Sequence, residues 1–100
     1  MDEAANGAPG HLRVRIGEPF KVELPANPTA GYAWRADFAG TRLELVEREV
    51  RPAGTTPGAA GVERFVFLPR ARGECPIRFT YGRAWEAAPV EERVILVEVE

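Results

Sequence analysis

Hydrophobic and polar residues alternate along most of the chain after residue 10. The segments 11–16 (HLRVRI) and 20–24 (FKVEL) place every second apolar side chain on one face. The same period of two recurs in 32–38, 62–69 and 75–82. Alternation of this kind is typical of half-buried β-strands. These five segments are therefore predicted to be strands.

Two further segments are harder to interpret. The apolar residues of 43–50 (LELVEREV) also fit a helical spacing, and only the neighbouring strands favour a strand there. The last segment, 93–100 (RVILVEVE), is apolar at consecutive positions. Its inward face is open, because Val94 and Leu96 compete with Ile95, Val97 and Val99. No segment carries a convincing helical pattern.

About seven short strands separated by turns predict an all-β fold, an immunoglobulin-like antiparallel β-sandwich. Two antiparallel sheets would pack face to face around a core of aromatic side chains. Residues 1–10 contain few large apolar side chains, so we expect a flexible N-terminal lead-in followed by one domain over 11–100. The residues expected in the core are Phe20, Trp34, Phe65, Phe67 and Phe79.

Composition narrows the functional classes. The chain has 100 residues, of which 45% are hydrophobic and 28% charged, as in ordinary globular domains. Its net charge of -2 provides no basic field for nucleic acid. No apolar run is long enough for a membrane span, and the N-terminus lacks the basic and apolar regions of a signal peptide. We expect neither a nucleic-acid nor a membrane partner, and the compartment stays open.

Candidate chemistry is sparse. Cys75 is the single cysteine and shares a face with Ile77 and Phe79, so we expect a buried, unreactive thiol. His11 is the single histidine, which makes a catalytic Cys–His pair formally available but not expected. No cluster of side chains has the spacing of metal ligands. We therefore expect no enzyme activity, no metal and no cofactor.

Three connections are longer than the roughly two to five residues that a hairpin needs. They cover residues 25–31, 52–61 and 82–90. The first two could be a plain turn and a linker, since Asn, Pro and Gly suit turns. Trp85 fits no strand alternation, and it is either an exposed binding anchor or a plug folded onto the sandwich. In an immunoglobulin-like strand order the three loops can gather at one end.

At these loops the sequence resembles the chagasin-type inhibitors of cysteine peptidases, which bind papain-like enzymes. The family's Asn-Pro-Thr-Thr-Gly-aromatic loop reads NPTAGY at 27–32, its Gly-x-Gly-Gly loop reads GAAG at 58–61, and its Arg-Pro-Trp loop reads RAW at 83–85. Order and spacing agree, and the likeness extends along most of 11–100. The departures are Ala30 for Thr, Ala60 for Gly and Ala84 for Pro. Without the proline, we expect the third loop to cost more to order on binding.

The resemblance implies a reversible proteinaceous inhibitor that blocks the active-site cleft with three loops, 27–32, 57–62 and 82–86. Thr29 would lie nearest the catalytic pair, the backbone of 58–61 would line one side, and Trp85 and Arg83 would contact the other. Tyr32 and Trp34 would root the first loop in the core, and Gly31 would take a backbone conformation that a side chain resists. The implied contact residues are Asn27, Pro28, Thr29, Ala30, Gly31, Tyr32, Gly58, Ala59, Ala60, Gly61, Arg83, Ala84 and Trp85.

We expect a monomer whose partner is a papain-like cysteine peptidase. The alternative is a generic immunoglobulin-like adhesion or carbohydrate-binding module, in which Trp85 would stack on a sugar ring.

Overall fold

The computed structural model describes residues 10–27, 31–51 and 61–100, and these contain seven strands and no helix. The predicted strand segments are confirmed, including the ambiguous one at 43–50. The strands are β1 (His11–Val14), β2 (Phe20–Ala26), β3 (Tyr32–Asp37), β4 (Leu43–Arg51), β5 (Gly61–Pro69), β6 (Gly73–Arg83) and β7 (Glu91–Val99).

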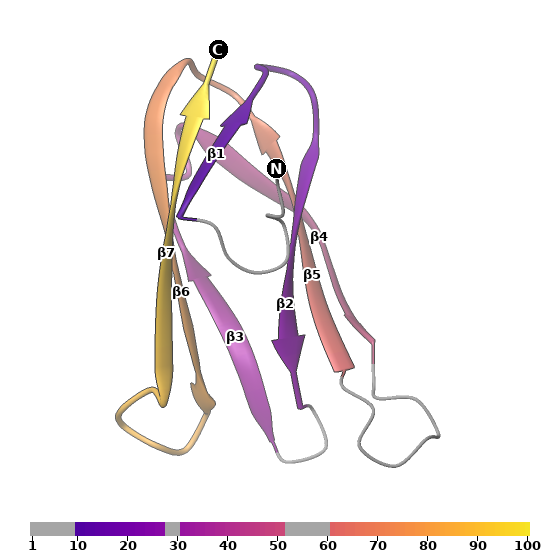
Figure 1. Cartoon of the computed structure of the whole chain (residues 1–100), viewed down its shortest axis with the longest axis vertical. Coiled ribbons are helices and arrows are strands. Elements are labelled where there is room, and N and C mark those ends of the chain that lie inside the picture. Colours follow the sequence, from indigo (N-terminus) through magenta and orange to yellow (C-terminus); the bar gives the residue numbers. More distant parts are fainter. Residues whose placement is uncertain (1–9, 28–30, 52–60) are drawn as a thin grey trace.

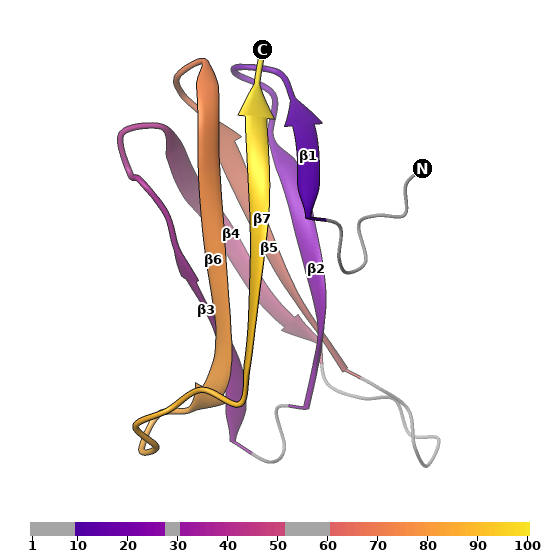
Figure 2. The ribbon, with the colours of Figure 1, turned by 60° about the vertical axis from the view of Figure 1, so that its left-hand side comes forward.

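The strands form two facing sheets, with the orders β1-β7-β6-β3 and β2-β5-β4 (Figures 1 and 2). This confirms the predicted sandwich. One pair departs from the expected antiparallel arrangement, because β1 runs parallel to β7. β1 and the next strand, β2, lie in different sheets, so no hairpin turn sets the direction of β1. The four-stranded sheet is therefore mixed.

The inward faces of both sheets supply a continuous apolar core. Trp34 is 2% exposed, and Phe65, Phe67 and Phe79 are at most 1% exposed. Phe20 lies at the rim of this core, where its ring stacks on Phe67 at a centroid distance of 5.5 Å. The predicted aromatic core is thus confirmed, with Phe20 only partly buried.

The structure resolves the inward face of β7. Ile95, Val97 and Val99 are buried, whereas Val94 is 53% exposed. Cys75 lies opposite Val97 on the neighbouring strand and is 1% exposed. The expected burial of Cys75 is confirmed, and its low reactivity stays a prediction.

A β-bulge explains why the pattern of β4 was ambiguous. Between Leu45 and Glu47 the register with β5 shifts, so that Val46 is an extra residue on β4. A bulge of this kind moves the following side chains out of simple alternation. β4 is also an edge strand whose residues are mostly exposed, so burial does not impose a period of two on it.

Candidate functional site

The three long connections leave from the same end of the sandwich. Strand register pairs Ala26 with Gly61, Arg51 with Val62, and Tyr32 with Arg83. The ends of β2, β4 and β6 and the starts of β3, β5 and β7 therefore meet at the end opposite the C-terminus (Figure 1). This is the gathering expected from an immunoglobulin-like strand order.

Part of the predicted site lies outside the described residues. Of the first loop, 27–32, the structure describes Asn27, Gly31 and Tyr32, and of the second, 57–62, it describes Gly61 and Val62. The third connection, residues 82–90, is described throughout. The predicted contact residues outside the described ranges are Pro28, Thr29, Ala30, Gly58, Ala59 and Ala60.

Hydrogen bonds hold both ends of the first loop. The Trp34 indole Nε1–H donates to the Pro25 carbonyl oxygen over 2.8 Å. The Asn27 backbone N–H donates to the Tyr81 hydroxyl oxygen, also over 2.8 Å. The chain is thus tied on the β2 side at Pro25 and Asn27, and on the β3 side at Trp34.

Three packed aromatic rings support the end of the sandwich that carries the loops. The Tyr81 ring lies 4.7 Å from the Trp34 ring and 5.3 Å from the Tyr32 ring, measured between centroids. Trp34 belongs to the buried core, as expected. Tyr32 is half-buried and rests on Tyr81, which itself packs against the core. The expected rooting in the core is therefore direct for Trp34 and indirect for Tyr32.

Gly31 joins the first loop to the third. Its φ is +85°, in the left-handed region that favours glycine, which confirms the expected backbone conformation. A Cβ atom at this position would lie only 2.8 Å from Cη2 of Trp85. The absence of a side chain at Gly31 therefore lets the indole of Trp85 rest on the loop backbone.

Trp85 is nevertheless 70% exposed, so it is not a plug buried in the sandwich. The Arg83 guanidinium lies 4.4 Å from the Tyr32 ring centroid and 5.8 Å from the Trp85 ring centroid. Such placement over aromatic faces is favourable for a cation. Arg83 also pairs with Glu86 across 3.8 Å, so within this chain it already supports the loop that carries Trp85.

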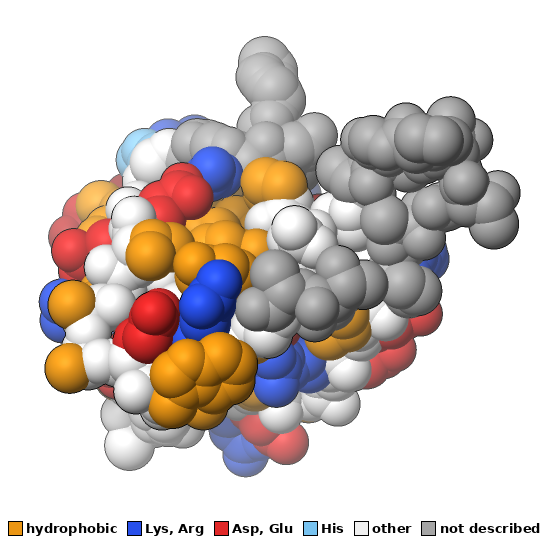
Figure 3. All heavy atoms as spheres, turned by 90° about the horizontal axis from the view of Figure 1, so that it is seen from below, with side chains coloured by type: hydrophobic (Ala, Val, Ile, Leu, Met, Phe, Trp, Pro, Cys, Tyr) orange, Lys and Arg blue, Asp and Glu red, His pale blue; other side chains and the backbone are white. Residues whose placement is uncertain are grey.

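The backbone of the third loop folds back tightly on β6. The Glu86 N–H donates to the Arg83 carbonyl, and the Val90 N–H donates to the Tyr81 carbonyl. A Cβ atom on Gly82 would lie 3.3 Å from Cα of Pro89, so the returning chain passes close to this glycine. Seen end-on, hydrophobic side chains gather here next to basic and acidic ones (Figure 3).

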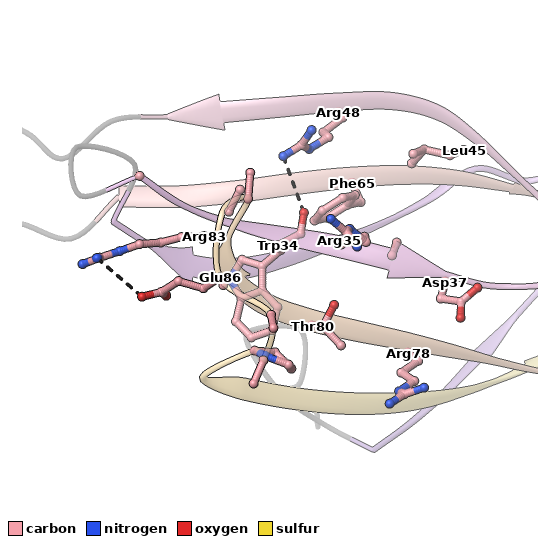
Figure 4. Close-up of a pocket in the computed structure, with 18 residues that line it drawn as sticks. Trp34, Arg35, Asp37, Leu45, Arg48, Phe65, Arg78, Thr80, Arg83 and Glu86 are labelled. Carbon is pink, nitrogen blue, oxygen red and sulfur yellow. Dashed lines mark hydrogen bonds and ion pairs between the residues drawn. The ribbon is translucent and has the colours of Figure 1, made fainter.

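An open groove of about 750 Å³ extends from this end along the outer edge of β3 (Figure 4). Gly31, Gly82 and the third loop border it at one end, and Asp37 and Leu45 lie toward the other. Arg35, Arg48 and Arg78 line its sides. Sequence reasoning did not find this groove, because it forms between the edge strands of two different sheets.

Sequence reasoning also missed a buried ion pair beneath the loops. Glu63 is 1% exposed and accepts a hydrogen bond of 2.8 Å from the Trp34 backbone N–H. Its second carboxylate oxygen accepts from Nε of Arg48, also over 2.8 Å. The available signal was the alternation of β5, which places Glu63 on the same inward face as Phe65 and Phe67.

The Cys–His pair that the sequence left formally available does not form. Cys75 faces the core, whereas His11 is exposed on the outer face and lies 3.3 Å from Glu98, so the two cannot form a nucleophile–base pair. Within residues 10–27, 31–51 and 61–100 there is no cluster of three or more metal-ligating side chains. In the same ranges, no helix is long and apolar enough to cross a membrane.

Comparison with known proteins gives consistent matches. Residues 13–99 match the family described as Chagasin family peptidase inhibitor. The chain is 36% identical to Chagasin of Trypanosoma cruzi over 92 residues, which is 85% of this chain and 81% of that protein. It is 27% identical to Amoebiasin-2 of Entamoeba histolytica over 79 residues, covering 75% of this chain and 63% of that protein.

Solved structures agree on the fold. A cysteine protease inhibitor from Entamoeba histolytica superposes with a TM-score of 0.79 at 23% identity, covering 90% of this chain and 86% of that one. The solution structure of amebosin superposes with a TM-score of 0.69 at 25% identity, covering 90% and 88%. Both share the sandwich described above.

Proposed function

Because the chain belongs to the chagasin family of peptidase inhibitors, we propose that it inhibits papain-like cysteine peptidases reversibly. The end of the sandwich that carries the three loops would enter the active-site cleft and exclude substrate. The family is one of inhibitors, not enzymes, and this chain would contribute no chemistry of its own.

The exposed Trp85 is the observation that carries this proposal. Aromatic and arginine side chains dominate binding energy in protein interfaces, above all when they lie centrally. Here the indole is 70% exposed, yet it rests on Gly31 and on the Arg83 guanidinium. A side chain that is already held in place loses less conformational entropy on binding. Trp85 therefore has the properties of a preorganised anchor.

The other two loops have roles that follow from the family resemblance. Residues 27–31 would lie over the catalytic cysteine and histidine of the peptidase, with Thr29 nearest to them. The backbone of 58–61 would line one wall of the cleft through main-chain hydrogen bonds. The hydrogen bonds of Asn27 and Trp34 support this role, because they fix both ends of the first loop before any partner arrives.

Titration of papain with the purified chain tests the proposal. We expect activity to disappear at stoichiometric or modestly higher inhibitor concentration, to return on dilution, and the chain to be recovered intact. Full papain activity at large excess of the chain would reject the proposal. That result would favour the carbohydrate-binding alternative, because an exposed tryptophan can also stack on a sugar ring.

A further inference from the structure

We infer that Glu63 is a positioning residue of the inhibitory end, where its buried carboxylate fixes the spacing between the first and second loops. This inference rests on the proposed function. It concerns a side chain that lies inside the sandwich and would touch no peptidase.

The position of Glu63 is the first argument. It follows Gly61, the first residue of β5, by two positions, and its register partners are Leu24 on β2 and Val50 on β4. β2 ends two residues after Leu24, and β4 ends one residue after Val50. One carboxylate therefore lies where three of the four strands that carry the first and second loops come together.

The fourth of these strands, β3, belongs to the opposite sheet, and Glu63 reaches it directly. Its carboxylate accepts from the Trp34 backbone N–H over 2.8 Å and from Nε of Arg48 over 2.8 Å. The Arg48 guanidinium in turn donates to the Trp34 carbonyl over 3.5 Å, as the dashed line in Figure 4 shows. The three residues form a closed polar bridge between the two sheets, immediately beneath the loops.

The chemistry of the site indicates that this bridge sets the relative position of the two sheets and does little to stabilise the fold. Glu63 is the single charged residue among the buried residues that the structure describes. Ion pairs buried in a core are often no more stabilising than apolar side chains of similar volume. Apolar packing has no preferred direction, whereas a hydrogen bond fixes a distance and an angle. What a carboxylate adds at this inward position is a defined separation between β3 and β5.

Glu63→Gln is the first test variant, because it keeps the shape and one oxygen acceptor for the Trp34 N–H but turns an NH₂ group toward Arg48. We expect its inhibition constant for papain to rise by about tenfold, since sites lose function when their support loosens by a fraction of an ångström. The amide NMR signals of Asn27, Gly31 and Gly61, which flank the two loops, should shift, and that of Gly17 at the opposite end should not.

Val97→Ala is the matched control for stability. Val97 is fully buried toward the other end of the sandwich, opposite Cys75, and its truncation lowers the thermal midpoint without touching the bridge. If Glu63→Gln fails to fold, Arg48 provides the second pair of variants, since its side chain is 45% exposed. Arg48→Met should weaken inhibition, and Arg48→Lys should restore part of it.

The outcomes separate the inference from the proposed function. If Glu63→Gln inhibits as well as a Val97→Ala variant of equal thermal midpoint, Glu63 is merely structural and the inference is wrong. Unshifted amide signals at Asn27, Gly31 and Gly61 would overturn it as well. If the parent chain itself does not inhibit papain, the proposed function fails, and the amide signals alone decide whether Glu63 sets the loop spacing.

Discussion

At the scale of single residues, Gly31 and Trp85 depend on each other. A positive φ explains why glycine suits position 31, but the same is true of Gly17, whose φ is +82°. The difference lies in the surroundings, since a Cβ atom on Gly17 would meet nothing within 4 Å while one on Gly31 would collide with the indole of Trp85. Glycine is therefore needed at position 31 for two reasons. The backbone has a positive φ, and a side chain would occupy the space that the indole of Trp85 fills.

Trp85→Ala should raise the inhibition constant for papain by at least about tenfold, because truncating a central aromatic anchor typically costs about 2–4 kcal/mol of binding. Most of the loss should appear in the dissociation rate. The thermal midpoint should move little, since the side chain is 70% exposed. Trp34→Ala is the contrasting variant: Trp34 is 2% exposed, so that change should lower stability first. Unchanged inhibition by Trp85→Ala would remove the third loop from the site.

Gly31→Ala should destabilise the fold by about 1–2 kcal/mol through backbone strain and should also weaken inhibition by displacing Trp85. Gly17→Ala is the matched control, with similar strain at the opposite end and no change in inhibition. In a Trp85→Ala background, Gly31→Ala should weaken inhibition much less than in the parent, because residues in contact give non-additive effects. Additive losses of binding energy would contradict the contact between the two loops.

Cys75→Ser tests the single cysteine, which the sequence made formally available as a nucleophile. The thiol is 1% exposed, so labelling by a thiol reagent should be slow in the folded protein and fast after denaturation. The serine hydroxyl would be buried among apolar side chains, which should lower stability by about 1–3 kcal/mol. Inhibition of papain by the folded variant should be unchanged. Rapid labelling of the native chain would show that the expectation of an inert thiol is wrong.

At the scale of elements, a substitution in the third loop is expected to strengthen inhibition. Ala84 stands where the family pattern has proline. Arg83, directly before it, ends β6 in an extended conformation, which is the conformation that the residue before a proline prefers. Ala84→Pro should tighten inhibition about two- to fivefold, because a proline that fits the bound conformation leaves the loop of the free, folded inhibitor less conformational entropy to lose on binding, and the entropic effect of a compatible proline is typically about 0.4–1 kcal/mol. An unchanged inhibition constant in a folded variant would mean that the loop is already fully ordered.

Strands were predictable from the sequence where one face of the strand is buried and the other is exposed to solvent. β2, β5 and β6 alternate because their inward side chains fill one core, and this imposes a period of two. The edge strand β4 was ambiguous, because the bulge at Val46 and the exposure of the strand erase that period. The parallel pairing of β1 with β7 was not predictable, since it depends on strands far apart in sequence.

The site was predictable in part for the same reason. Trp85 was found because it fits no strand alternation. The first loop was found because it is longer than a hairpin turn requires and because its residues match the family pattern. The contact of Trp85 with Gly31 and the bridge from Glu63 to Trp34 and Arg48 were not found. Each joins elements far apart in the chain, and local pattern carries no signal for such contacts. Glu63 was nevertheless visible as a charge on an inward position of β5.

At the scale of the whole molecule, the open sheet edges bear on the oligomeric state. Exposed edges invite pairing with a second chain unless something blocks them. Here β1 has only four residues, β2 carries Pro25, and β4 carries a bulge among alternating glutamates and arginines. On β3, the backbone N–H and carbonyl of Trp34 are occupied by Glu63 and Arg48. Each of the four edges in the described part of the chain thus has its own obstacle to pairing.

We therefore predict a monomer of 11.0 kDa that forms a one-to-one complex with papain. Light scattering after gel filtration should give the monomer mass across a concentration series, and the complex should contain one copy of each protein. The one-to-one stoichiometry is expected because the three loops at one end of the sandwich would fill one active-site cleft. The monomer is expected because each edge strand carries an obstacle to pairing with a second chain. A concentration-dependent dimer would contradict the edge argument, and its loss on Val46→Lys would identify β4 as the strand that pairs. Glu98→Gln, on the outer face away from both the loops and the edge of β4, is the control that should leave mass and stoichiometry unchanged.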